Sequence, residues 1–403
     1  MLIGDGMSQV DTRGLTLLAV AGFASAAAFR ICDPLLPKLA QAFETTTGSA
    51  ARVITAFSIA YGLLQLLYGP IGDRYGKYRV VATATLACTV GSVGCATVGS
   101  LNWLILFRVI AGATAAGIVP LSMAWIGDTV PYAQRQATLA RFLTGTIMGM
   151  AGGQFIGGFF ADTLGWRWAF VLLAACYIAV GLLLHAELKR HAVAHTGPSL
   201  RPMPASSPQF VAQMRSVLQN RWARIILLTV CLEGTVVFGT LAFIPAYLHT
   251  RFDLSLTAAG AIVGIYGMGG LVYTFLVRRL IPRFGEPGLA LGGGLILCAA
   301  FAGLLFGSAW PWALLASFAA GLGFYMLHNT LQTHATQMAP AARGTAVSLF
   351  SAALFMGQSV GVAIAAVIVD VASASWLFGI AAIALPLLGF AFARLLRDRQ
   401  LAL

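Results

Sequence analysis

The sequence predicts an all-α membrane protein with twelve transmembrane helices in two pseudo-symmetric six-helix bundles, and three observations lead to this fold class. The chain of 403 residues is 59% hydrophobic and only 9% charged, and its mean hydropathy is +0.85, so it lacks the polar surface of a soluble domain. Apolar stretches of about 20 residues, the length that crosses ~30 Å of hydrocarbon, recur along the chain. The second half of the chain also repeats the first.

The predicted spans are separated by short polar segments and by one long one. In order they cover residues 15–39, 51–72, 79–98, 103–126, 138–161, 166–186, 223–248, 258–277, 288–308, 312–337, 344–369 and 375–393. The predicted domains are a cytoplasmic N-terminal segment (1–14), a first bundle (15–186), a cytoplasmic linker (187–222), a second bundle (223–393) and a cytoplasmic tail (394–403). Within the linker, residues 208–220 predict either a short interfacial helix or a loop.

The internal repeat has an offset of 208 to 209 residues. Matching pairs are Pro37 and Pro245, Phe43 and Phe252, Arg74 and Arg283, Gly76 and Gly285, Trp103 and Trp312, Gly112 and Gly321, Arg135 and Arg343, Gly149 and Gly357, Gly153 and Gly361, and Asp162 and Asp370. Parallel repeats of this kind place a binding site at their interface near the bilayer midplane. A membrane protein built from duplicated halves is typical of a transporter.

The net charge of +12 predicts orientation in the membrane and no nucleic-acid partner. If both termini are cytoplasmic, cytoplasmic segments hold 19 of the 25 Lys and Arg residues, as the positive-inside rule requires. We therefore expect a multi-pass protein of the bacterial cytoplasmic (inner) membrane, with both termini inside.

Ionised side chains within spans are costly, about 2.5 to 3.5 kcal/mol at the bilayer centre, and mark a functional cavity. Arg30 and Asp33 in the first span are three residues apart, so they share a helix face and form an ion pair. Pro34 and Pro37 follow, and because proline has no N–H, they predict a kinked, polar patch.

In the second half, Glu233 is the main acidic residue within a span. Its carboxylate either binds a second proton or the substrate, or it is an interfacial residue near the cytoplasmic end. The tenth span has a polar face formed by His328, Asn329 and Gln332. The histidine of this face can titrate near neutral pH. Further candidates for the cavity, which could equally be packing residues, are Tyr61, Gln154, Tyr266, Tyr325 and Gln358. Three acids near span ends are expected to cap helices or face water: Asp128, Asp162 and Asp370.

Glycines at i, i+4 spacing mark one face of the fifth span and are echoed on the eleventh. Such stripes let helix backbones approach closely. They serve either tight packing or bending and sliding of a helix. The fifth-span glycines are Gly145, Gly149, Gly153 and Gly157, and the eleventh-span glycines are Gly357 and Gly361.

The loop from Gly69 to Arg79 reads GPIGDRYGKYR and resembles the GxxxDRxGRK loop of the major facilitator superfamily, with Tyr78 in place of a second basic residue. The stretch Leu104–Ala116 resembles the family's LxxxRxxxGxxAA pattern, with Ala111 where Gln is common. Residues 149–158 resemble the GxxxGPxxGG signature of antiporters, although Gln154 replaces the proline. Trp166–Phe170 resembles the WRWxF start of the sixth helix in drug:proton antiporters.

The resemblance implies roles for particular residues. Asp73 would cap the N-terminus of the eleventh helix and latch the outward-facing state. Arg108 would face the same cavity as the first helix and exchange contact with Asp33, so that protonation of Asp33 releases its partner. The alternative for Asp33 and Arg108 is a static salt bridge that only fixes helix packing. Proton coupling is thus expected from Asp33, Arg108 and Glu233. Conformational gating is expected from Gly69, Asp73, Arg74, Gly76, Lys77, Arg79, Gly149, Gly153, Gly157 and Gly158.

The predicted function is a proton-coupled secondary transporter, an efflux antiporter for small amphipathic drugs or metabolites that works by rocker-switch alternating access. The alternative is a metabolite transporter for sugars, organic anions or amino acids. A receptor or membrane enzyme on such a scaffold is a third class, but no nucleotide-binding, nucleophile or metal-ligand motif supports it. We expect no enzyme activity, cofactor or metal, a proton gradient as energy source, and a monomer whose partners are substrate, protons and lipid.

Overall fold

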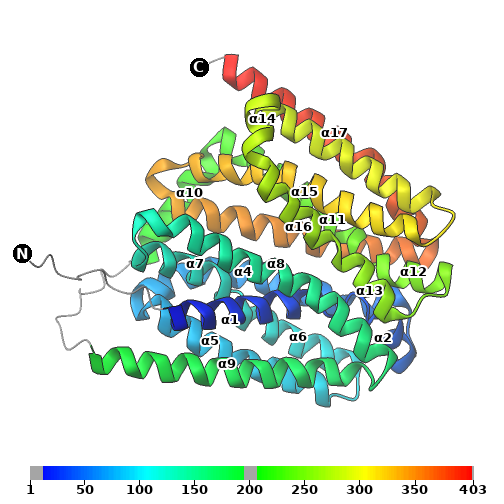
Figure 1. The fold of residues 1–403 in the computed structure, drawn as a ribbon, viewed down its shortest axis with the longest axis horizontal. Helices are drawn as coiled ribbons and strands as arrows, with labels where there is room; N and C mark the ends of the chain where they lie inside the picture. The colour runs from blue at the N-terminus through cyan, green and yellow to red at the C-terminus, as the bar shows by residue number, and fades with distance from the viewer. Residues whose placement is uncertain (1–11, 195–206, 402–403) are drawn as a thin grey trace, which may run out of the picture.

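The computed structural model describes residues 12–194 and 207–401, and all of its regular elements are helices (Figure 1). The helices of the first half are α1 (Thr12–Arg30), α2 (Leu36–Ala42), α3 (Thr47–Ala50), α4 (Arg52–Tyr75), α5 (Lys77–Thr97), α6 (Leu101–Ala115), α7 (Ile118–Thr129), α8 (Tyr132–Asp162) and α9 (Trp166–Ala194). The second half has α10 (Ser207–Gln219), α11 (Arg221–Leu241), α12 (Ile244–Phe252), α13 (Leu256–Gly264), α14 (Tyr266–Phe306), α15 (Pro311–Gln337), the 3-10 turn η1 (Pro340–Ala342), α16 (Arg343–Val371) and α17 (Ala374–Leu401).

Nine helical segments in the described part of the chain are long and apolar enough to cross a membrane. One of them, Leu256–Phe306, is 51 residues long and covers the predicted span 258–277 and all but the last two residues of the span 288–308. Inside it, Gly285 has φ 65, a left-handed conformation that glycine adopts without a steric penalty, and the helix kinks there. The all-helical membrane fold is therefore confirmed, and the count of twelve spans stays a prediction.

The first and seventh predicted spans are interrupted at equivalent places. α1 ends at Arg30 and α2 begins at Leu36, while α11 ends at Leu241 and α12 begins at Ile244. Each second segment has proline in its first turn, where the missing N–H costs nothing. Because proline cannot continue the hydrogen bonding of the preceding helix, the chain breaks before it. The kink predicted for the first span is confirmed.

The helices of each half pack in the same pairs. In the first half α1 lies against α8 and α5 against α9, and in the second half α11 lies against α16 and α14 against α17. The glycine stripes let α1 approach α8 closely, and α11 approach α16. A Cβ on Gly149 would overlap the carbonyl oxygen of Phe23. A Cβ on Gly357 would likewise overlap that of Cys231. Tight packing is thus one established role of both stripes, and each half has its own apolar core.

Two seams join the halves, one between α4 and α16 and the other between α8 and α13. We call the end of the bundle that carries α10 the α10 end, and the opposite end, where α3 and α13 begin, the α13 end (Figure 1). The seam between α8 and α13 is close because Gly260 lies against the carbonyl of Gln154. The seams therefore bring the polar residues of the fifth span next to the second half.

The linker contains a helix rather than a loop at residues 208–220, because α10 spans Ser207–Gln219. Val217 is buried, and Phe210 and Met214 are half-buried on the same face. Thr345 Oγ1 donates a hydrogen bond of 2.8 Å to Gln213 Oε1, which ties α10 to the start of α16. α9 continues to Ala194, beyond the predicted end of the first bundle at 186, and residues 195–206 of the linker lie outside the described residues.

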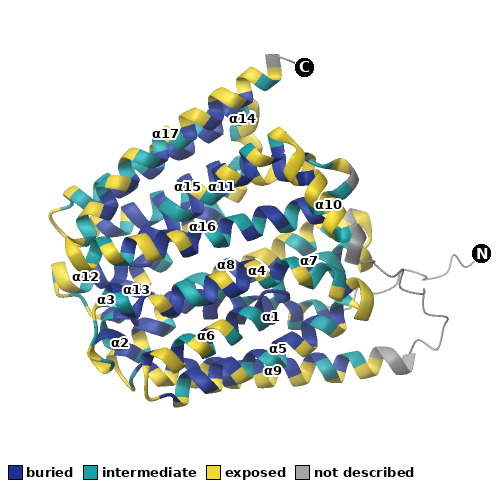
Figure 2. Cartoon of the chain, turned by 180° about the vertical axis from the view of Figure 1, so that it is seen from behind, coloured by how far each residue is buried: buried dark blue, intermediate teal, exposed yellow. Residues whose placement is uncertain are grey.

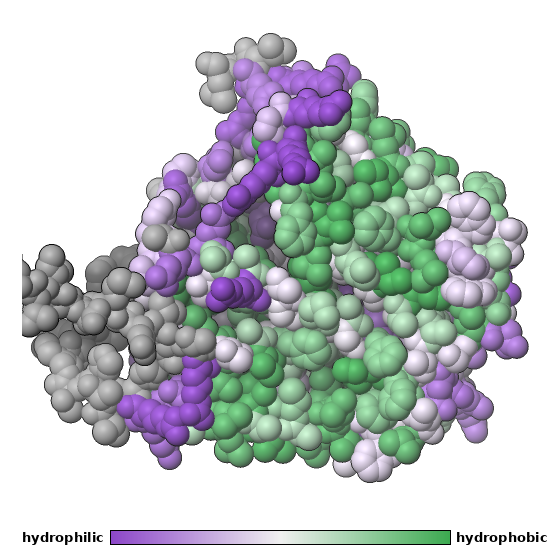
Figure 3. Space-filling model, in the orientation of Figure 1, coloured by the Kyte–Doolittle hydropathy of each residue, from purple (hydrophilic) through white to green (hydrophobic). Residues whose placement is uncertain are grey.

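The surface fits a bilayer. Figure 2 shows that the outer helices alternate buried and exposed residues, and Figure 3 shows a broad apolar flank with polar side chains gathered toward the ends of the bundle. Large exposed apolar side chains include Phe275, Val371 and Phe306, each at least 80% exposed. Since water would not tolerate so large an apolar surface, the flank is the part that lipid covers.

Candidate functional site

The ion pair predicted in the first span is present and buried. Arg30 Nη1 lies 3.4 Å from Asp33 Oδ2, and the two side chains are 2% and 0% exposed. Gln154 on α8 donates a second hydrogen bond of 2.7 Å to the same carboxylate oxygen. Asp33 lies in the break between α1 and α2, where the chain has left the helical hydrogen-bonding pattern. The kink and the neighbouring helix α8 thus build one polar cluster, Arg30–Asp33–Gln154.

This cluster retains unused hydrogen-bonding capacity. Among the described residues, Arg30 Nη2, Asp33 Oδ1 and Gln154 Oε1 are buried atoms with no hydrogen-bond partner. Leaving such groups unpaired is costly, about 1–3 kcal/mol each, so they mark a place that water, a proton or a ligand can occupy. Burial of the three atoms together gives the cluster the character of a binding site.

The cluster faces the second half of the chain. The guanidinium of Arg30 lies 4.4 Å from the ring centroid of Phe238, which occupies the equivalent position in the second half. A small cavity lined by both halves lies beside Arg30 and Gln154, and Tyr266 and Leu241 form part of its wall. The hydroxyl of Tyr266 is another buried group without a partner in the described chain. The geometry therefore places Arg30, Gln154 and Tyr266 around one interfacial space.

Arg108 does not contact Asp33, contrary to the expected exchange of partners. Its Nη1 donates to the carbonyl of Ala28 at 3.0 Å, and its Nε donates to the carbonyl of Val53 at 3.3 Å. The guanidinium also lies 4.1 Å from the ring centroid of Phe57. Arg108 thus faces the first span as expected, but here it joins α6 to α1 and α4. An exchange with Asp33 in another conformation stays a prediction.

Glu233 forms a second buried cluster with His328. The His328 Nδ1 atom lies 2.8 Å from Glu233 Oε2, and Glu233 is 0% exposed. Glu233 lies twelve residues into α11, or ~18 Å along a helix with a rise of ~1.5 Å per residue. Glu233 thus lies buried in the middle of α11 rather than at its start. Its Oε1 has no hydrogen-bond partner among the described residues, and the same holds for Asp33 Oδ1.

The other residues of the predicted polar face on the tenth span separate along α15. The His328 ring stacks on Phe324 with centroids 4.8 Å apart, and Asn329 is half-buried. Gln332 is exposed. The buried part of this predicted face is thus His328.

The remaining cavity candidates line the seams in different ways. Tyr61 lies in an aromatic cluster and contacts Phe355 of the second half at 4.6 Å between ring centroids. Gln358 donates to Ser58 Oγ at 3.1 Å across the seam between α4 and α16. Tyr325 packs against Tyr266 at 6.3 Å. These contacts make Tyr61 and Gln358 part of the interface between halves rather than of the Arg30–Asp33–Gln154 cluster.

The predicted cap by Asp73 on the eleventh helix is not formed in this structure. Asp73 Oδ1 instead lies 3.6 Å from Lys77 Nζ, and Asp73 is 56% exposed. Lys77 also pairs with Asp128 at the end of α7. Within the described residues, no side chain caps α16, whose N-cap residue is Ala342. The expected loop from Gly69 to Arg79 is instead the helical end of α4 and start of α5, joined at Gly76. Its Asp73 is paired within its own half and is exposed.

Carboxylate caps across the halves are found at the α13 end instead. Asp162, at the end of α8, accepts hydrogen bonds from the amides of Leu256 and Thr257 at 3.2 and 2.7 Å. Asp370, at the end of α16, accepts from Thr46 Oγ1 at 2.6 Å and from the amide of Gly48 at 2.9 Å. We call these two contacts the crossed caps. Asp162 and Asp370 were expected either to cap helices or to face water, and the capping role is confirmed for both.

Sequence reasoning missed a second brace at the α10 end. His334 Nε2 lies 3.0 Å from Glu286 Oε2, and Glu286 directly follows the kink glycine of α14. It therefore occupies the place that Lys77 has in the first half, with the opposite charge. The repeated turn glycines were the available signal, but nothing in the sequence indicated that His334 would reach this turn.

Comparison with known proteins agrees with this architecture. A family model described as Major Facilitator Superfamily matches residues 18–346. An uncharacterized MFS-type transporter of Bacillus subtilis, YceJ, is 27% identical over 346 residues, which cover 83% of this chain and 84% of YceJ. The multidrug export protein EmrB of Escherichia coli is 30% identical over 172 residues, which cover 43% of this chain and 34% of EmrB.

Solved structures share the fold as well. A mutant form of the nucleoside transporter NupG has a TM-score of 0.77 and 14% sequence identity, and the match covers 94% of this chain and 98% of that chain. This likeness bears on the fold alone. With a family model that matches most of its length, the chain belongs to the major facilitator superfamily, a family of membrane transporters and not of enzymes.

Proposed function

We propose that this chain is a proton-coupled secondary transporter that exports small amphipathic compounds in exchange for protons. Asp33 is the main proton site of this proposal, Glu233 is a second one, and substrate occupies the space beside Arg30, Gln154 and Tyr266. A proton gradient supplies the energy. The acting unit is a monomer.

The observation that carries the proposal is the buried Asp33 carboxylate, with one oxygen bonded and the other free. Asp33 Oδ2 is held by Arg30 and Gln154, while Oδ1 has no partner in the described chain. A proton or a cationic group at Oδ1 would change the charge of a desolvated cluster at the boundary of the halves. Because charge changes in such surroundings have large energies, occupancy of this carboxylate can bias how the halves sit together.

Alternating access is supported by where the halves touch. The crossed caps hold the α13 end together, while at the α10 end Asp73 is bonded within its own half. We propose that the α10 end is cytoplasmic, in line with its Lys and Arg residues, and that this conformation is open toward the cytoplasm. The membrane would be the bacterial inner membrane. Twelve crossings would result if α1–α2 and α8 span it and the segment Leu256–Phe306 crosses twice.

An apolar cavity wall with few charges suits amphipathic drugs, and the likeness to a multidrug export protein over part of the chain supports export. One observation favours a metabolite carrier as the second candidate. Within the predicted spans, two buried arginines, Arg30 and Arg108, match two buried acids, Asp33 and Glu233, so the interior does not select cations by net charge. An anionic or zwitterionic metabolite is therefore compatible with the same site.

The coupling is tested with purified protein in weakly buffered detergent solution, in which a pH-sensitive dye reports protons released on addition of substrate. Compounds are first found by thermal shift, because a ligand that binds the folded state raises its apparent stability. We expect wild-type protein to release protons and Asp33→Asn to release few or none. The matched control is Asp128→Asn, the same change at an acid that is 58% exposed, and it should behave as wild type.

Full proton release by the Asp33→Asn variant would refute the coupling role of Asp33. The thermal-shift screen separates the two candidate functions, since hits confined to sugars, organic anions or amino acids would favour the metabolite carrier. Hits among lipophilic drugs that lose their effect in Arg30→Gln but not in Arg279→Gln, an exposed site, would support the export of amphipathic compounds.

A further inference from the structure

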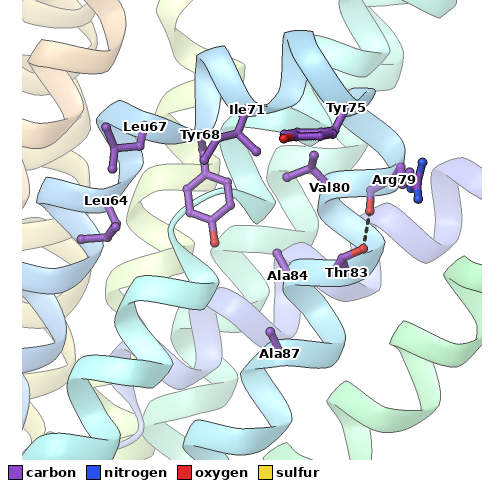
Figure 4. Close-up of a pocket in the computed structure, with 10 residues that line it drawn as sticks. All are labelled: Leu64, Leu67, Tyr68, Ile71, Tyr75, Arg79, Val80, Thr83, Ala84 and Ala87. Carbon is purple, nitrogen blue, oxygen red and sulfur yellow. Dashed lines mark hydrogen bonds between the residues drawn. The ribbon is translucent and has the colours of Figure 1, made fainter. Parts of the chain in front are cut away.

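A long groove of about 440 Å³ runs between α4 and α5 near the α10 end (Figure 4). It is separate from the space beside Arg30. Apolar side chains from both helices line it: Leu64, Leu67, Ile71, Val80, Ala84 and Ala87. Its length runs along the helices, so it has the shape of a channel for an extended apolar chain rather than of a pocket for a compact solute.

Two polar side chains of the groove, Tyr68 and Thr83, use their hydroxyl groups in hydrogen bonds to backbone carbonyls. Tyr68 donates its hydroxyl to the carbonyls of Ala113 and Thr114, both at 3.1 Å, and Thr83 donates to the carbonyl of Arg79 at 3.0 Å. The guanidinium of Arg79 has neither an ion pair nor a hydrogen-bond acceptor among the residues of 12–194 and 207–401. Figure 4 shows this side chain beside Tyr75 at one end of the groove, with Ala87 at the other.

The groove opens away from the other half of the protein. Its outer rim is exposed, with Leu67 49%, Ile71 38% and Tyr75 55% accessible. The opposite face of α4 is the one that packs on the second half, because a Cβ on Gly62 would contact Phe355 of α16. The exposed rim is apolar and lies on helices of membrane-spanning length. The medium that reaches it is therefore the lipid of the leaflet on the α10 side.

We propose that this groove binds an anionic phospholipid, with one acyl chain along the apolar walls and the phosphate on the guanidinium of Arg79. The complementarity has two parts. The walls offer apolar surface to a hydrocarbon chain, and a free guanidinium at the interfacial end matches a phosphate with paired hydrogen bonds. Long basic side chains near helix ends reach toward the headgroup layer, where anionic lipid attracts them. The bound lipid would then contact the ends of α4 and α5 that meet at Gly76, where Asp73 and Lys77 lie.

The site is tested by thermal unfolding of the detergent-purified full chain with added phosphatidylglycerol or phosphatidylcholine of the same acyl chains. We expect phosphatidylglycerol to raise the apparent Tm of the wild type more than phosphatidylcholine does. Arg79→Gln should lose at least half of that difference. Ala87→Phe, which fills the apolar end without changing any charge, should lose it as well. Arg279→Gln, an exposed arginine on α14, is the control for a general charge effect and should keep it.

A second measurement locates the lipid directly. Phosphatidylglycerol with a photoactivatable diazirine near the end of one acyl chain should label peptides of α4 and α5, and Ala87→Phe should reduce this labelling severalfold. Equal loss of the Tm difference in Arg79→Gln and Arg279→Gln, or labelling confined to other helices, would overturn the proposal. Displacement of the labelled lipid by transported compounds but not by phosphatidylglycerol would also overturn it, because the groove would then hold substrate.

Discussion

Asp162 and Asp370 stand at equivalent positions of the two halves, and each caps a helix that begins in the opposite half. The Asp162 carboxylate accepts hydrogen bonds from the amides of Leu256 and Thr257 at the start of α13. The Asp370 carboxylate accepts hydrogen bonds from Thr46 Oγ1 and from the amide of Gly48 at the start of α3. A carboxylate at a helix N-terminus meets unpaired N–H groups and the positive end of the helix dipole. The internal repeat thus becomes a symmetric pair of contacts that must break if the halves separate at the α13 end.

Removal of one crossed cap should favour opening of the α13 end. Asp370→Ala loses charge-assisted hydrogen bonds, and we expect a destabilisation of the closed state by about 1–3 kcal/mol, because such bonds contribute about that much. Spin labels on cysteines at Glu44 and Val371, with the native cysteines replaced by alanine, would report the distance across this seam by double electron–electron resonance. The population at longer distance should grow.

The control for this measurement is Asp398→Ala, which removes an exposed carboxylate near the end of α17, away from the crossed caps. It should leave the distance distribution unchanged. A distribution that is the same in Asp370→Ala and in the wild type would mean that the crossed caps do not contribute to closing.

Close contact between α1 and α8 should make the glycine stripe intolerant of even one methyl group. A Cβ on Gly153 would overlap the carbonyl oxygen of Ala27, so Gly153→Ala should destabilise the fold by about 1–3 kcal/mol, the usual cost of overpacking. The matched change is Gly344→Ala, since a Cβ on Gly344 meets nothing within 4 Å. We expect that variant to unfold at the wild-type temperature or slightly above it. Thermal unfolding followed by tryptophan fluorescence makes the comparison.

Arg108 should be irreplaceable by lysine. Its guanidinium reaches the carbonyls of Ala28 and Val53 at once and covers the ring of Phe57. A lysine ammonium is a compact charge and cannot keep this planar arrangement. We expect Arg108→Lys to lower the apparent Tm, by an amount equivalent to about 1–3 kcal/mol for a buried group left without its partner. An unchanged Tm would show that these contacts do not stabilise the fold.

If Glu233 is a second proton site, replacing it by the neutral glutamine should change the number of protons released per bound substrate and leave the fold intact. Glu233→Gln keeps an oxygen that can accept from His328 Nδ1 but removes the charge. We expect fewer protons released per bound substrate than in the wild type, measured with the dye assay and a substrate titration by calorimetry. Asp33→Asn and Glu233→Gln together should abolish release. Wild-type stoichiometry in Glu233→Gln would assign that pair a packing role.

The first span shows how far local sequence reasoning reaches. The spacing of Arg30 and Asp33 predicted their ion pair, and Pro34 and Pro37 predicted the break, because both depend on contacts within a single turn of chain. Gln154 could be named only as a candidate. Its bond to Asp33 spans 121 positions of sequence, and helix packing brings the two together.

Arg108 and Asp73 show the opposite limit. Both were assigned partners by resemblance, and both have other partners in this structure. A side chain at the boundary between moving halves meets different groups in different conformations, so a motif identifies the residue without fixing its partner. The structure records one arrangement, with the crossed caps made and Asp73 held by Lys77.

The sequence by itself determined the apolar helices, the duplicated halves, the break of the first span and the family, because hydropathy, repeat spacing and proline chemistry are local or periodic properties. Only the tertiary structure decided that Glu233 meets His328, that Asp162 and Asp370 cap the opposite halves, and that Arg108 binds backbone carbonyls. These contacts depend on which helix faces pack together, and in a chain of uniformly apolar helices that choice follows from small differences in packing rather than from any pattern along the chain.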